Sequence, residues 1–410
     1  MKKILSVLLC LILAFAATGC TGDGGENSSS GSYLSGKDNA VTEPIVWYTD
    51  GVTLTEKQLK AAADMKYQKP KNVIMMISDG MGLNDIIIAE KFSETLNDYG
   101  VTFEHLPNIG EVTTHDIKGG VTDSAASATA LATGVKTYSG QVGMKNRENS
   151  SKADNLKNVC EYAREAGKKV GIVTNDSVLG ATPASFTVHA STRYRTTTIV
   201  EGFLDFKPDV LIGNGYADFM KIAERDANKD KLAQINVANG FDKFKAALND
   251  TSKSNLPFLG FHHFDLDAEE NYLAQSTQIA LNKLENENGF FLMVEGAACD
   301  KAGHAGVAQR KVTGVGVFDR AVAVAIDYCM KNPDTVLVIT SDHETGGVTI
   351  PSGDYPLDEN IFTILEHTGV NVGVFALGYG TEYFDDTVVD NTDIGKFLIA
   401  AVQGKELPKK

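Results

Sequence analysis

The stretch NVIMMISDGMG, residues 72–82, joins a nearly continuous apolar run to a polar turn that contains two glycines. An apolar run of this length is typical of a β-strand that is buried on both faces of a sheet. Similar runs occur at 169–174, 210–212, 290–294, 335–340 and 371–377. Helical patterns accompany them at 54–66, 154–166, 272–286 and 311–330. The alternation predicts an α/β fold with a mainly parallel central sheet and helices on both faces.

Polar side chains follow three of the predicted strands. Asp79 comes after the first strand, Glu295 after FFLMV at 290–294, and Asp342 after TVLVIT at 335–340. In open parallel sheets, ligands bind outside the carboxyl ends of the strands. A single acidic residue after a strand is more often a turn former or a helix cap. Three such acids in one chain indicate a functional site at this edge of the sheet.

Histidines lie close to these acids in the sequence. Asp300 and His304 are four residues apart, so a helical turn would place them on one face. Asp342 and His343 are neighbours, and they converge only if the chain turns there, as the following ETGG suggests. His367 lies in EHTG before the last apolar run. A lone histidine is more often structural than a ligand, but carboxylates and imidazoles in combination predict a metal site.

Residues 121–130 read VTDSAASATA, which predicts the start of a helix with Asp123 as its N-cap and Gly134 just past its end. Ser124 would lie in the first turn, where unpaired backbone N–H groups and the helix dipole stabilise an anion. The same field would stabilise the alkoxide form of a serine hydroxyl. Taken alone, however, the segment is better explained as a packing helix rich in small residues.

Together these segments resemble the alkaline phosphatase family. The resemblance covers residues from about 72 to 377, and its motifs occur in the family's order: SDGMG at 78–82, VTDSAASATA at 121–130, ATPASF at 181–186, VEGA at 294–297, SDH at 341–343 and EHTG at 366–369. It implies hydrolysis of phosphate monoesters through a phosphoserine intermediate. In this family Ser124 would be the nucleophile and Arg193 would hold the phosphate.

The resemblance also implies three metal ions, two Zn²⁺ and one Mg²⁺. The expected ligands are Asp300, His304 and His367 for one zinc, Asp79, Asp342 and His343 for the other, and Asp79, Thr182 and Glu295 for the magnesium. Nitrogen ligands suit zinc and an all-oxygen set suits magnesium. Two metal ions roughly 4 Å apart can clamp both oxygens of an in-line displacement. Their charge would let a chain of net charge −15 bind phosphate.

Three positions depart from the family pattern. Gly180 stands where relatives often carry Asp or His, so the magnesium site is expected to be weaker, differently hydrated or occupied by another metal. Lys301 resembles a lysine of bacterial members and would reach the phosphate through water. The segment between His343 and His367 is short, where many relatives carry a larger insertion that helps to form a dimer. The chain is therefore expected to be a monomer or a homodimer.

The N-terminus predicts export. Residues 1–19 have a basic start and an apolar run too short to span a bilayer, as in a signal peptide. ATGC at 17–20 resembles a bacterial lipobox, in which Cys20 would carry lipid, although an ordinary signal peptide with an incidental cysteine is the alternative. Residues 20–40 would form a flexible tether, and 41–410 a single catalytic domain. We expect a lipoprotein outside the cytoplasm, at the bacterial cell surface or the periplasmic face of a membrane.

Composition and the remaining motifs narrow the partners. The acidic surface disfavours nucleic acid and anionic lipid, so we expect membrane contact through the N-terminal lipid alone. The family resemblance implies small phosphate monoesters as substrates. Residues 214–256 would form either a surface insertion or a substrate-facing lid. The mature thiols Cys160, Cys299 and Cys329 are interpreted as mostly buried, with one disulfide as the alternative. His262 and His263 are assigned to a surface or insertion in preference to a metal site.

Two other functions remain as alternatives to a broad phosphomonoesterase. One is a phosphodiesterase or a narrow-specificity phosphatase of the same superfamily. The other is a non-catalytic lipoprotein that binds phosphate. The presence of Ser124, Arg193 and the expected metal ligands favours the monoesterase.

Overall fold

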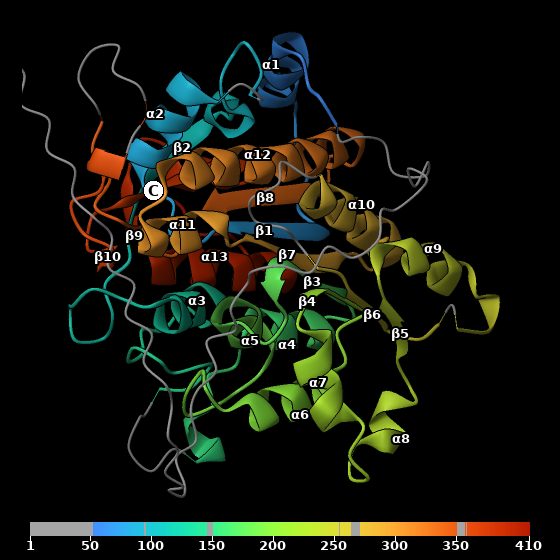
Figure 1. The fold of residues 1–410 in the computed structure, drawn as a ribbon. Coiled ribbons are helices and arrows are strands. Elements are labelled where there is room, and N and C mark those ends of the chain that lie inside the picture. The colour runs from blue at the N-terminus through green and yellow to red at the C-terminus, as the bar shows by residue number, and fades with distance from the viewer. Residues whose placement is uncertain are drawn as a thin grey trace, which may run out of the picture. The chain divides into compact units, whose positions relative to one another are not determined.

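The run at 72–77 forms the central strand of a ten-stranded sheet within the described residues. β1 (Asn72–Ser78) lies between β8 (Thr335–Thr340) and β7 (Phe290–Gly296), and β3 (Lys169–Ser177) lies beyond β7 (Figure 1). All four strands are parallel, with Val73 opposite Val336 on one side and Phe291 on the other. Because parallel neighbours end at the same edge, the polar residues that follow them are brought together.

The computed structural model describes residues 52–93, 96–145, 151–253, 255–263, 271–350, 357 and 359–410. The predicted signal peptide, the lipidated Cys20 and the tether at 20–40 lie outside these residues, so they stay predictions. No helix within the described ranges has both the length and the apolar composition needed to cross a membrane.

The outer strands complete the sheet in the order β12-β2-β11-β8-β1-β7-β3-β4-β6-β5. Their bounds are Val388–Asp390 for β12, Asn108–Thr113 for β2, Val372–Leu377 for β11, Val210–Asn214 for β4, Phe258–Phe261 for β6 and Asn236–Asn239 for β5. β11 runs antiparallel to both of its neighbours, and the other pairings are parallel. The sheet is thus mainly parallel, as the sequence predicts.

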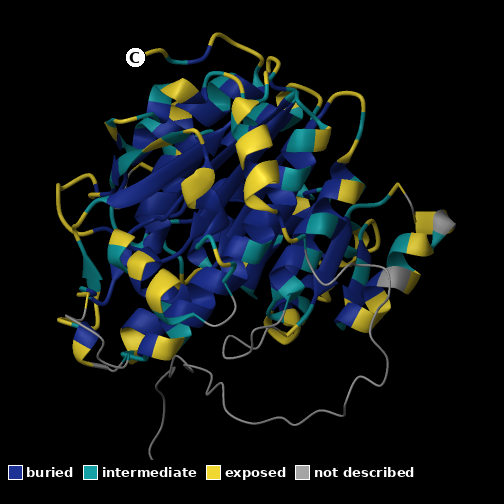
Figure 2. Ribbon diagram, turned by 90° about the horizontal axis from the view of Figure 1, so that it is seen from above, coloured by how far each residue is buried: buried dark blue, intermediate teal, exposed yellow. Residues whose placement is uncertain are grey.

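Helices cover both faces of the sheet (Figure 1). Successive strand side chains point to opposite faces, so Val73, Met75 and Ile77 join one core cluster while Ile74 and Met76 join another. The first cluster includes residues of α3 (Ser124–Thr133), α4 (Val159–Glu165), α5 (Ala181–Thr187) and α13 (Asn391–Val402). The second includes residues of α2 (Leu83–Phe92), α10 (Tyr272–Leu284) and α12 (Ala308–Lys331). The sheet lies between them as a buried layer (Figure 2).

The predicted helices are present, and one of them starts later than expected. α1 spans Glu56–Asp64, and α10 and α12 match their predicted ranges within three residues. The pattern at 154–166 yields α4 only from Val159, because Asn158 forms a capping box with Glu161 and so sets the first turn. A 3₁₀ turn at Lys152–Asp154 precedes it.

The sequence did not predict several shorter elements. The helices are α6 (Thr196–Phe206), α7 (Tyr216–Ala223), α8 (Lys229–Leu232), α9 (Phe241–Asn249) and α11 (Ala298–Ala305). The other elements are a two-stranded sheet of β9 (Glu344–Thr345) and β10 (His367–Thr368) and 3₁₀ turns at Thr102–His105, Thr251–Lys253, Glu359–Ile361 and Thr381–Phe384. Residues 214–256 supply α7 to α9 and the edge strand β5, and Phe219 and Ile222 are buried in the core.

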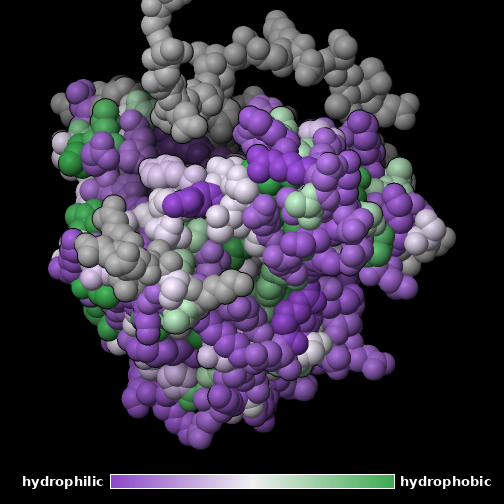
Figure 3. Space-filling view, turned by 90° about the horizontal axis from the view of Figure 1, so that it is seen from below, coloured by the Kyte–Doolittle hydropathy of each residue, from purple (hydrophilic) through white to green (hydrophobic). Residues whose placement is uncertain are grey.

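The cysteines and the outer surface agree with the composition. Cys160, Cys299 and Cys329 are buried free thiols, which confirms that interpretation over the alternative of a disulfide. The face of the molecule drawn in Figure 3 is mainly hydrophilic, and its hydrophobic side chains are scattered. Such a distribution is ordinary for a folded domain in water.

Candidate active site

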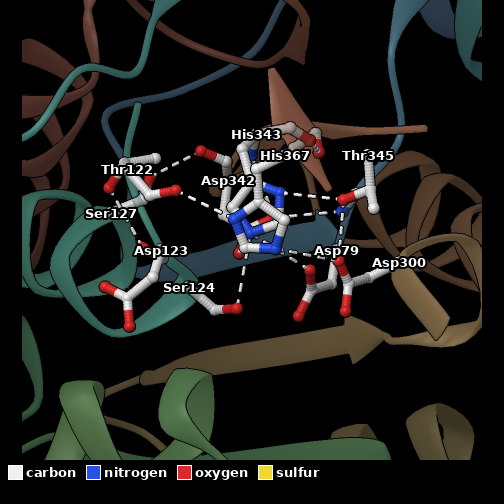
Figure 4. Close-up of polar contacts among 12 residues, drawn as sticks. Asp79, Thr122, Asp123, Ser124, Ser127, Asp300, Asp342, His343, Thr345 and His367 are labelled. Carbon is white, nitrogen blue, oxygen red and sulfur yellow. Dashed lines mark hydrogen bonds and ion pairs between the residues drawn. The ribbon is translucent and has the colours of Figure 1, made fainter. Parts of the chain in front are cut away.

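The carboxyl ends of the four central strands bring the sequence-predicted residues into one site. Asp79 follows β1, Glu295 is near the end of β7, and Asp342 follows β8. The backbone N–H of Asp300 donates to the Asp79 carbonyl at 2.9 Å, which ties the start of α11 to the end of β1. Figure 4 shows the side chains of Asp79, Asp300 and Asp342 grouped around the rings of His343 and His367, beside Ser124.

The serine lies where the sequence predicts it, in the first turn of α3. Asp123 caps the helix by accepting a hydrogen bond from the Ala126 N–H at 3.0 Å, and Gly134 ends it with a φ of 71°. Ser124 is buried, and its Oγ lies 3.4 Å from Nε2 of His343. Ser127 Oγ donates to the Asp342 carbonyl at 2.7 Å, so α3 is anchored directly to the end of β8.

Asp300, His304 and His367 form a nearly equilateral triangle of ligand atoms. The two Nε2 atoms are 3.1 Å apart, and each lies 3.3 Å from Asp300 Oδ1. Ligands about 2.05 Å from a tetrahedral zinc ion are separated by about 3.3 Å. The triangle therefore has the size of one face of a zinc coordination tetrahedron.

Hydrogen bonds at the far side of the imidazoles orient these ligands. His304 Nδ1 lies 2.7 Å from the Leu365 carbonyl, and His367 Nδ1 lies 2.9 Å from the Thr122 carbonyl. A carbonyl only accepts, so each Nδ1 carries the proton and each neutral ring presents an Nε2 lone pair to the other. Two lone pairs 3.1 Å apart require a cation between them, either a proton or a metal ion. Second-sphere bonds of this kind are typical of histidine ligands.

A second group, Asp79, Asp342 and His343, adjoins the first. His343 Nε2 is 3.2 Å from Asp342 Oδ2 and 3.6 Å from Asp79 Oδ1, and all three side chains are buried. Asp342 Oδ1 accepts from the N–H groups of Gly80 and His343, whereas Asp342 Oδ2 and Asp79 Oδ1 accept no hydrogen bond from the described residues. Buried carboxylate oxygens without a partner are costly unless a cation binds them. These atoms fit a second metal ion.

The turn after Asp342 and His343 explains how both groups meet. Gly346 and Gly347 have φ values of 110° and 56°, which favour glycine, and the chain reverses there as predicted. β9 then pairs with β10, with Thr345 opposite His367. The His343 and His367 rings stack with centroids 3.6 Å apart. One potential ligand atom from each of Asp300, His343 and His367 also lies within 4.8 Å of the other two.

Thr345 is a site residue that the sequence motifs did not reveal. Its hydroxyl donates to Asp300 Oδ1 at 2.7 Å and lies 3.2 Å from His343 Nδ1. Since the hydroxyl proton goes to the carboxylate, the hydroxyl oxygen accepts from His343 Nδ1–H, and Nε2 of His343 is left as a lone pair. One hydroxyl thus orients a ligand in each of the two groups. The signal was present only as proximity to His343 in the sequence.

Glu295 and Thr182 form the oxygen-rich side of the site. Thr174 Oγ1 donates to Glu295 Oε2 at 2.5 Å, and both residues are buried. Thr182 Oγ1 is also buried, in the first turn of α5. It faces Glu295 and lowers the pKa of that carboxyl, but it forms no hydrogen bond of normal geometry within the described residues. An unpartnered hydroxyl beside a buried carboxylate fits a hard cation that binds oxygen.

The electrostatics show carboxylates that lack a counter-charge. Burial raises the pKa of Asp79 well above its usual value, and repulsion from Asp342, Asp300 and Glu295 adds to the effect. The pKa of Asp342 and that of Glu295 rise to about 7, chiefly through burial. At neutral pH these groups would ionise fully only with added positive charge, as divalent ions would provide.

In the group of Asp300, His304 and His367, bound protons supply the positive charge that a metal ion would otherwise supply. The pKa of His367 rises to about 9, because its hydrogen bonds to Asp300 and the Thr122 carbonyl outweigh the effect of burial. For Asp300, bonds to His304 and His367 overcome burial and hold its pKa well below the usual value. Burial keeps the pKa of His343 well below its ordinary value, so its ring is neutral.

Two cationic side chains border the site. Arg193 Nη1 lies 3.2 Å from Asp123 Oδ2, and the other oxygen of Asp123 accepts from the Ala126 and Gly140 N–H groups. The N-cap of the serine helix therefore also positions the arginine, a link that the sequence did not reveal. Lys301 Nζ pairs with Asp176 Oδ2 at 2.9 Å.

The remaining histidines interact elsewhere. His262 lies against the rings of Tyr272 and Phe241, with centroid distances of 4.2 and 5.2 Å, and His263 is exposed. His189 lies 3.3 Å from Glu161, and His115 lies 3.4 Å from Asp390. None of these residues belongs to the ligand groups found among the described residues.

The fold and the site define an α/β protein with two adjoining metal-binding groups beside a serine at a helix N-terminus. A sequence model of the alkaline phosphatase family matches residues 70–362. The chain therefore belongs to the alkaline phosphatase family.

Individual relatives agree with that assignment. The chain is 37% identical over 312 residues to the alkaline phosphatase of Schizosaccharomyces pombe, covering 69% of this chain and 57% of that protein. It is 31% identical over 351 residues to the Escherichia coli alkaline phosphatase, covering 71% of this chain and 74% of that protein. The chain thus spans little more than half the length of the yeast relatives.

Solved structures show the same fold. The alkaline phosphatase from the Antarctic bacterium TAB5 superposes with a TM-score of 0.69 at 29% identity, covering 83% of this chain and all of that one. A variant of the TAB5 enzyme, in which one histidine is replaced by glutamate, has Mg bound in a site named M3. It superposes with a TM-score of 0.70 at 29% identity over the same shares of the two chains.

Proposed function

We propose that the chain hydrolyses phosphate monoesters through a phosphoserine intermediate on Ser124. The observation that carries the proposal is the position of Ser124 Oγ. It lies at the positive end of α3 and 3.4 Å from His343 Nε2, and His343 in turn lies beside the buried, unpartnered oxygens of Asp79 and Asp342. A nucleophile at this point would face any phosphate that the cations of the site hold.

We propose two zinc ions and one magnesium ion as the cofactors. The triangle of Asp300, His304 and His367 would hold one zinc ion, and Asp79, Asp342 and His343 the other. Thr182, Glu295 and Asp79 would hold magnesium, in line with the TAB5 variant, a similar protein that has Mg bound in its M3 site. When bound, the ions supply the positive charge that polarises the phosphate ester and stabilises both reacting oxygens.

The chain's own residues would act as follows. Ser124 would lose its hydroxyl proton to water, and its Oγ, stabilised by the field of the α3 N-terminus, would form a bond to phosphorus as the bond from phosphorus to the ester oxygen breaks. The leaving alkoxide would take a proton from water, and a further water molecule would cleave the phosphoserine to release phosphate and restore the hydroxyl of Ser124. Arg193 would hold two phosphate oxygens with its planar guanidinium, oriented by Asp123. Lys301 would contact the phosphate through water. Burial of Ser124 and of the surrounding acids excludes bulk water and so strengthens each of these interactions.

Magnitudes support a mechanism based on concentrated positive charge. Enzymes accelerate monoester hydrolysis by up to about 10²¹-fold, which corresponds to roughly 28 kcal/mol. A positioned acid or base contributes only about 10²–10⁴-fold. The imidazoles and carboxylates found here are arranged as ligands and not as a base for Ser124, because Nε2 of His343 also faces Asp342 and Asp79.

For localisation, oligomeric state and substrates, we propose the same properties that the sequence predicts. The enzyme would act outside the cytoplasm, anchored through lipid on Cys20, as a monomer or a homodimer. Its substrates would be small phosphate monoesters and not nucleic acids, in keeping with a net charge of −15.

The test is the Ser124→Ala variant assayed with p-nitrophenyl phosphate. We expect the wild type to turn the ester over, to lose activity on chelation and to recover it with Zn²⁺ and Mg²⁺. Ser124→Ala should lose at least about 10³-fold in kcat. Ser252→Ala, at an exposed serine that donates to Asp250 in the 3₁₀ turn Thr251–Lys253, should stay active. Full activity of Ser124→Ala would exclude the proposed nucleophile. Preferential turnover of bis(p-nitrophenyl) phosphate would instead support the phosphodiesterase alternative.

A further inference from the structure

The magnesium side of the site lacks a side chain at Gly180. This residue is the N-cap of α5, two positions before Thr182, and its φ of −57° and ψ of 161° suit any residue. A Cβ built there would lie 3.0 Å from the Ser177 carbonyl, a contact that a small backbone shift would relieve. The glycine is therefore not needed for the conformation of the chain. Because Gly180 has no side chain, another residue must provide the polar group that Asp or His would provide there.

Asp176, four residues earlier, lies beside the same ligands. It is in β3, the neighbour of β7, and its N–H donates to Thr174 Oγ1 at 2.9 Å. The same Thr174 hydroxyl donates to Glu295 Oε2 at 2.5 Å. One threonine thus joins the backbone of Asp176 to the carboxylate of Glu295. After burial, the negative charge of Asp176 is also among the causes that raise the pKa of Glu295.

Asp176 holds the side chain of Lys301. The ammonium lies 2.9 Å from Asp176 Oδ2, and both side chains are partly buried. Lys301 directly follows Asp300 in α11, and its charge lowers the pKa of Asp79. The Asp176–Lys301 pair therefore spans the space from the Glu295 side of the site to the Asp79 and Asp300 side.

Two buried atoms show that this space is suited to a cation. Thr182 Oγ1 and Asp79 Oδ1 have no hydrogen-bond partner among the described residues. With Glu295 they form an oxygen set too small to complete six-fold coordination, and Mg²⁺ usually keeps several water ligands. Those waters need hydrogen-bond acceptors around them, and outer carboxylates normally supply them.

We propose that Asp176 is a positioning residue that supplies the outer carboxylate missing at Gly180. It would accept hydrogen bonds from water on a magnesium ion held by Thr182, Glu295 and Asp79, and would hold Lys301 in place through the same carboxylate. The inference rests on the proposed function only for the identity of the ion. Its physical basis is the shared Thr174 bridge and the 2.9 Å ion pair.

The test compares Asp176→Asn with the double variant Asp176→Asn/Gly180→Asp, both loaded with zinc. Asparagine keeps the size of the side chain and removes its charge. We expect Asp176→Asn to bind Mg²⁺ about 10–100-fold more weakly, the usual effect of losing an outer-shell partner. The double variant should recover affinity to within about threefold, because the new carboxylate would extend from the N-cap of α5. Affinity is read by calorimetry and by the Mg²⁺-dependent rise in Tm, without substrate.

The control is Asp205→Asn, which breaks an exposed ion pair with Lys231 and should leave Mg²⁺ affinity unchanged. Unchanged affinity in Asp176→Asn would overturn the inference. A loss that Gly180→Asp does not repair would overturn it too, since Asp176 would then act on the fold and not on the ion. Because binding is measured without turnover, a protein that binds Mg²⁺ as expected but hydrolyses no monoester would refute the proposed function alone.

Discussion

Two groups of buried charge lie close together beneath the edge of the sheet that carries the candidate site, and their charges are compensated in different ways. Asp85, in α2, receives a hydrogen bond from Lys311 Nζ at 2.9 Å and one from the Gly82 N–H at 2.8 Å. Both side chains of this ion pair are fully buried. Asp79 and Asp342 are also buried, but they face each other, Asp300 and the His343 ring in place of a paired lysine. Each of the three aspartates, Asp85 included, has one oxygen without a hydrogen-bond partner among the described residues, so the difference lies in the counter-charge.

The difference separates structural charge from functional charge. Lys311 also donates to the Gly80 carbonyl at 3.0 Å, so the ion pair fastens the backbone next to Asp79. At the structural turn, Lys311 supplies the positive charge that neutralises Asp85. At the candidate site, Asp79 and Asp342 would be neutralised by metal ions, which can also bind substrate.

The largest effect should follow from breaking the metal-dependent group with Asp342→Asn. The amide can still accept from the Gly80 and His343 N–H groups through one oxygen, so the turn is preserved. An uncharged amide NH2 group, which cannot ligate a metal ion, replaces Oδ2. We expect kcat/KM to fall by about 10³-fold or more, equivalent to several kcal/mol of lost metal assistance. Metal analysis of the purified variant should show one zinc ion fewer. Full zinc content with full activity would contradict the ligand assignment.

The next largest effect should come from the Asp85–Lys311 ion pair, and it should appear in the free energy of unfolding. Lys311→Met leaves Asp85 as an unpaired buried charge, and we expect the free energy of unfolding in urea to fall by about 3–5 kcal/mol. Asp85→Asn combined with Lys311→Met should recover most of this loss, because the neutral amide no longer needs a counter-charge.

Zinc content provides the discriminating control for this pair. It should remain normal in Lys311→Met at saturating zinc, since the ligands are untouched. The exposed pair Asp226–Lys229 gives the baseline, because its removal should change stability by less than about 1 kcal/mol. If the Lys311→Met protein were as stable as the wild type, the Asp85–Lys311 pair would not stabilise the fold, and the contrast with the metal-binding carboxylates would fail.

A pH series should separate the two groups without mutation. In metal-free protein Asp342 and Glu295 keep their protons up to a pKa of about 7, whereas unfolded carboxylates lose them near pH 4. His367, with a pKa of about 9, likewise holds a proton that an unfolded histidine releases at about 6.5. His343 and His262 oppose this trend below about pH 6.5, because burial lowers the pKa of both rings, that of His262 to about 4. The raised pKa of Asp79 and the pKa of about 7 of Asp319, both caused chiefly by burial, offset them. On balance the native state binds more protons, and its stability falls as pH rises from about 4 to about 9.

The expected loss is on the order of a few kcal/mol across that window. Metal-saturated protein should show a much flatter profile between about pH 6 and 9, because bound ions replace the protons. Urea unfolding at each pH, with and without a chelator, measures both curves. Metal-free protein that gains stability between about pH 5 and 8 would show that these carboxylates are not the uncompensated charges of the fold.

The smallest effect should follow from Thr345→Val, which removes the hydroxyl shared by Asp300 and His343. We expect zinc affinity to fall by about 10–100-fold, with little change in kcat once zinc is saturating. Thr345→Ser keeps the hydroxyl and should bind zinc nearly as the wild type does. Competition with a chromogenic chelator measures the zinc affinities. Equal affinities for the valine and serine variants would show that the Thr345 hydroxyl does not orient the ligands.

Much of the site could be predicted because it follows local rules. Asp79, Glu295 and Asp342 were recognisable as acids at the ends of apolar runs. The position of Ser124 followed from the helix cap before it, but its expected role came only from the family resemblance. The partners that the sequence did not reveal act over long separations. The contact of Asp123 with Arg193, of Thr345 with Asp300 and of Asp176 with Lys301 each joins residues tens or hundreds of positions apart.

The sequence by itself determined the α/β alternation, the order of the strand ends and the residue types available to bind metal, because burial and helix capping depend on near neighbours. Only the tertiary structure decided which strands became neighbours, and hence which acids share a pocket. It also decided which buried charge received a lysine and which was left open. Those outcomes depend on distances between segments that no local pattern encodes, and at separations of about 3 Å they determine whether two groups form an ion pair or ligate a common ion.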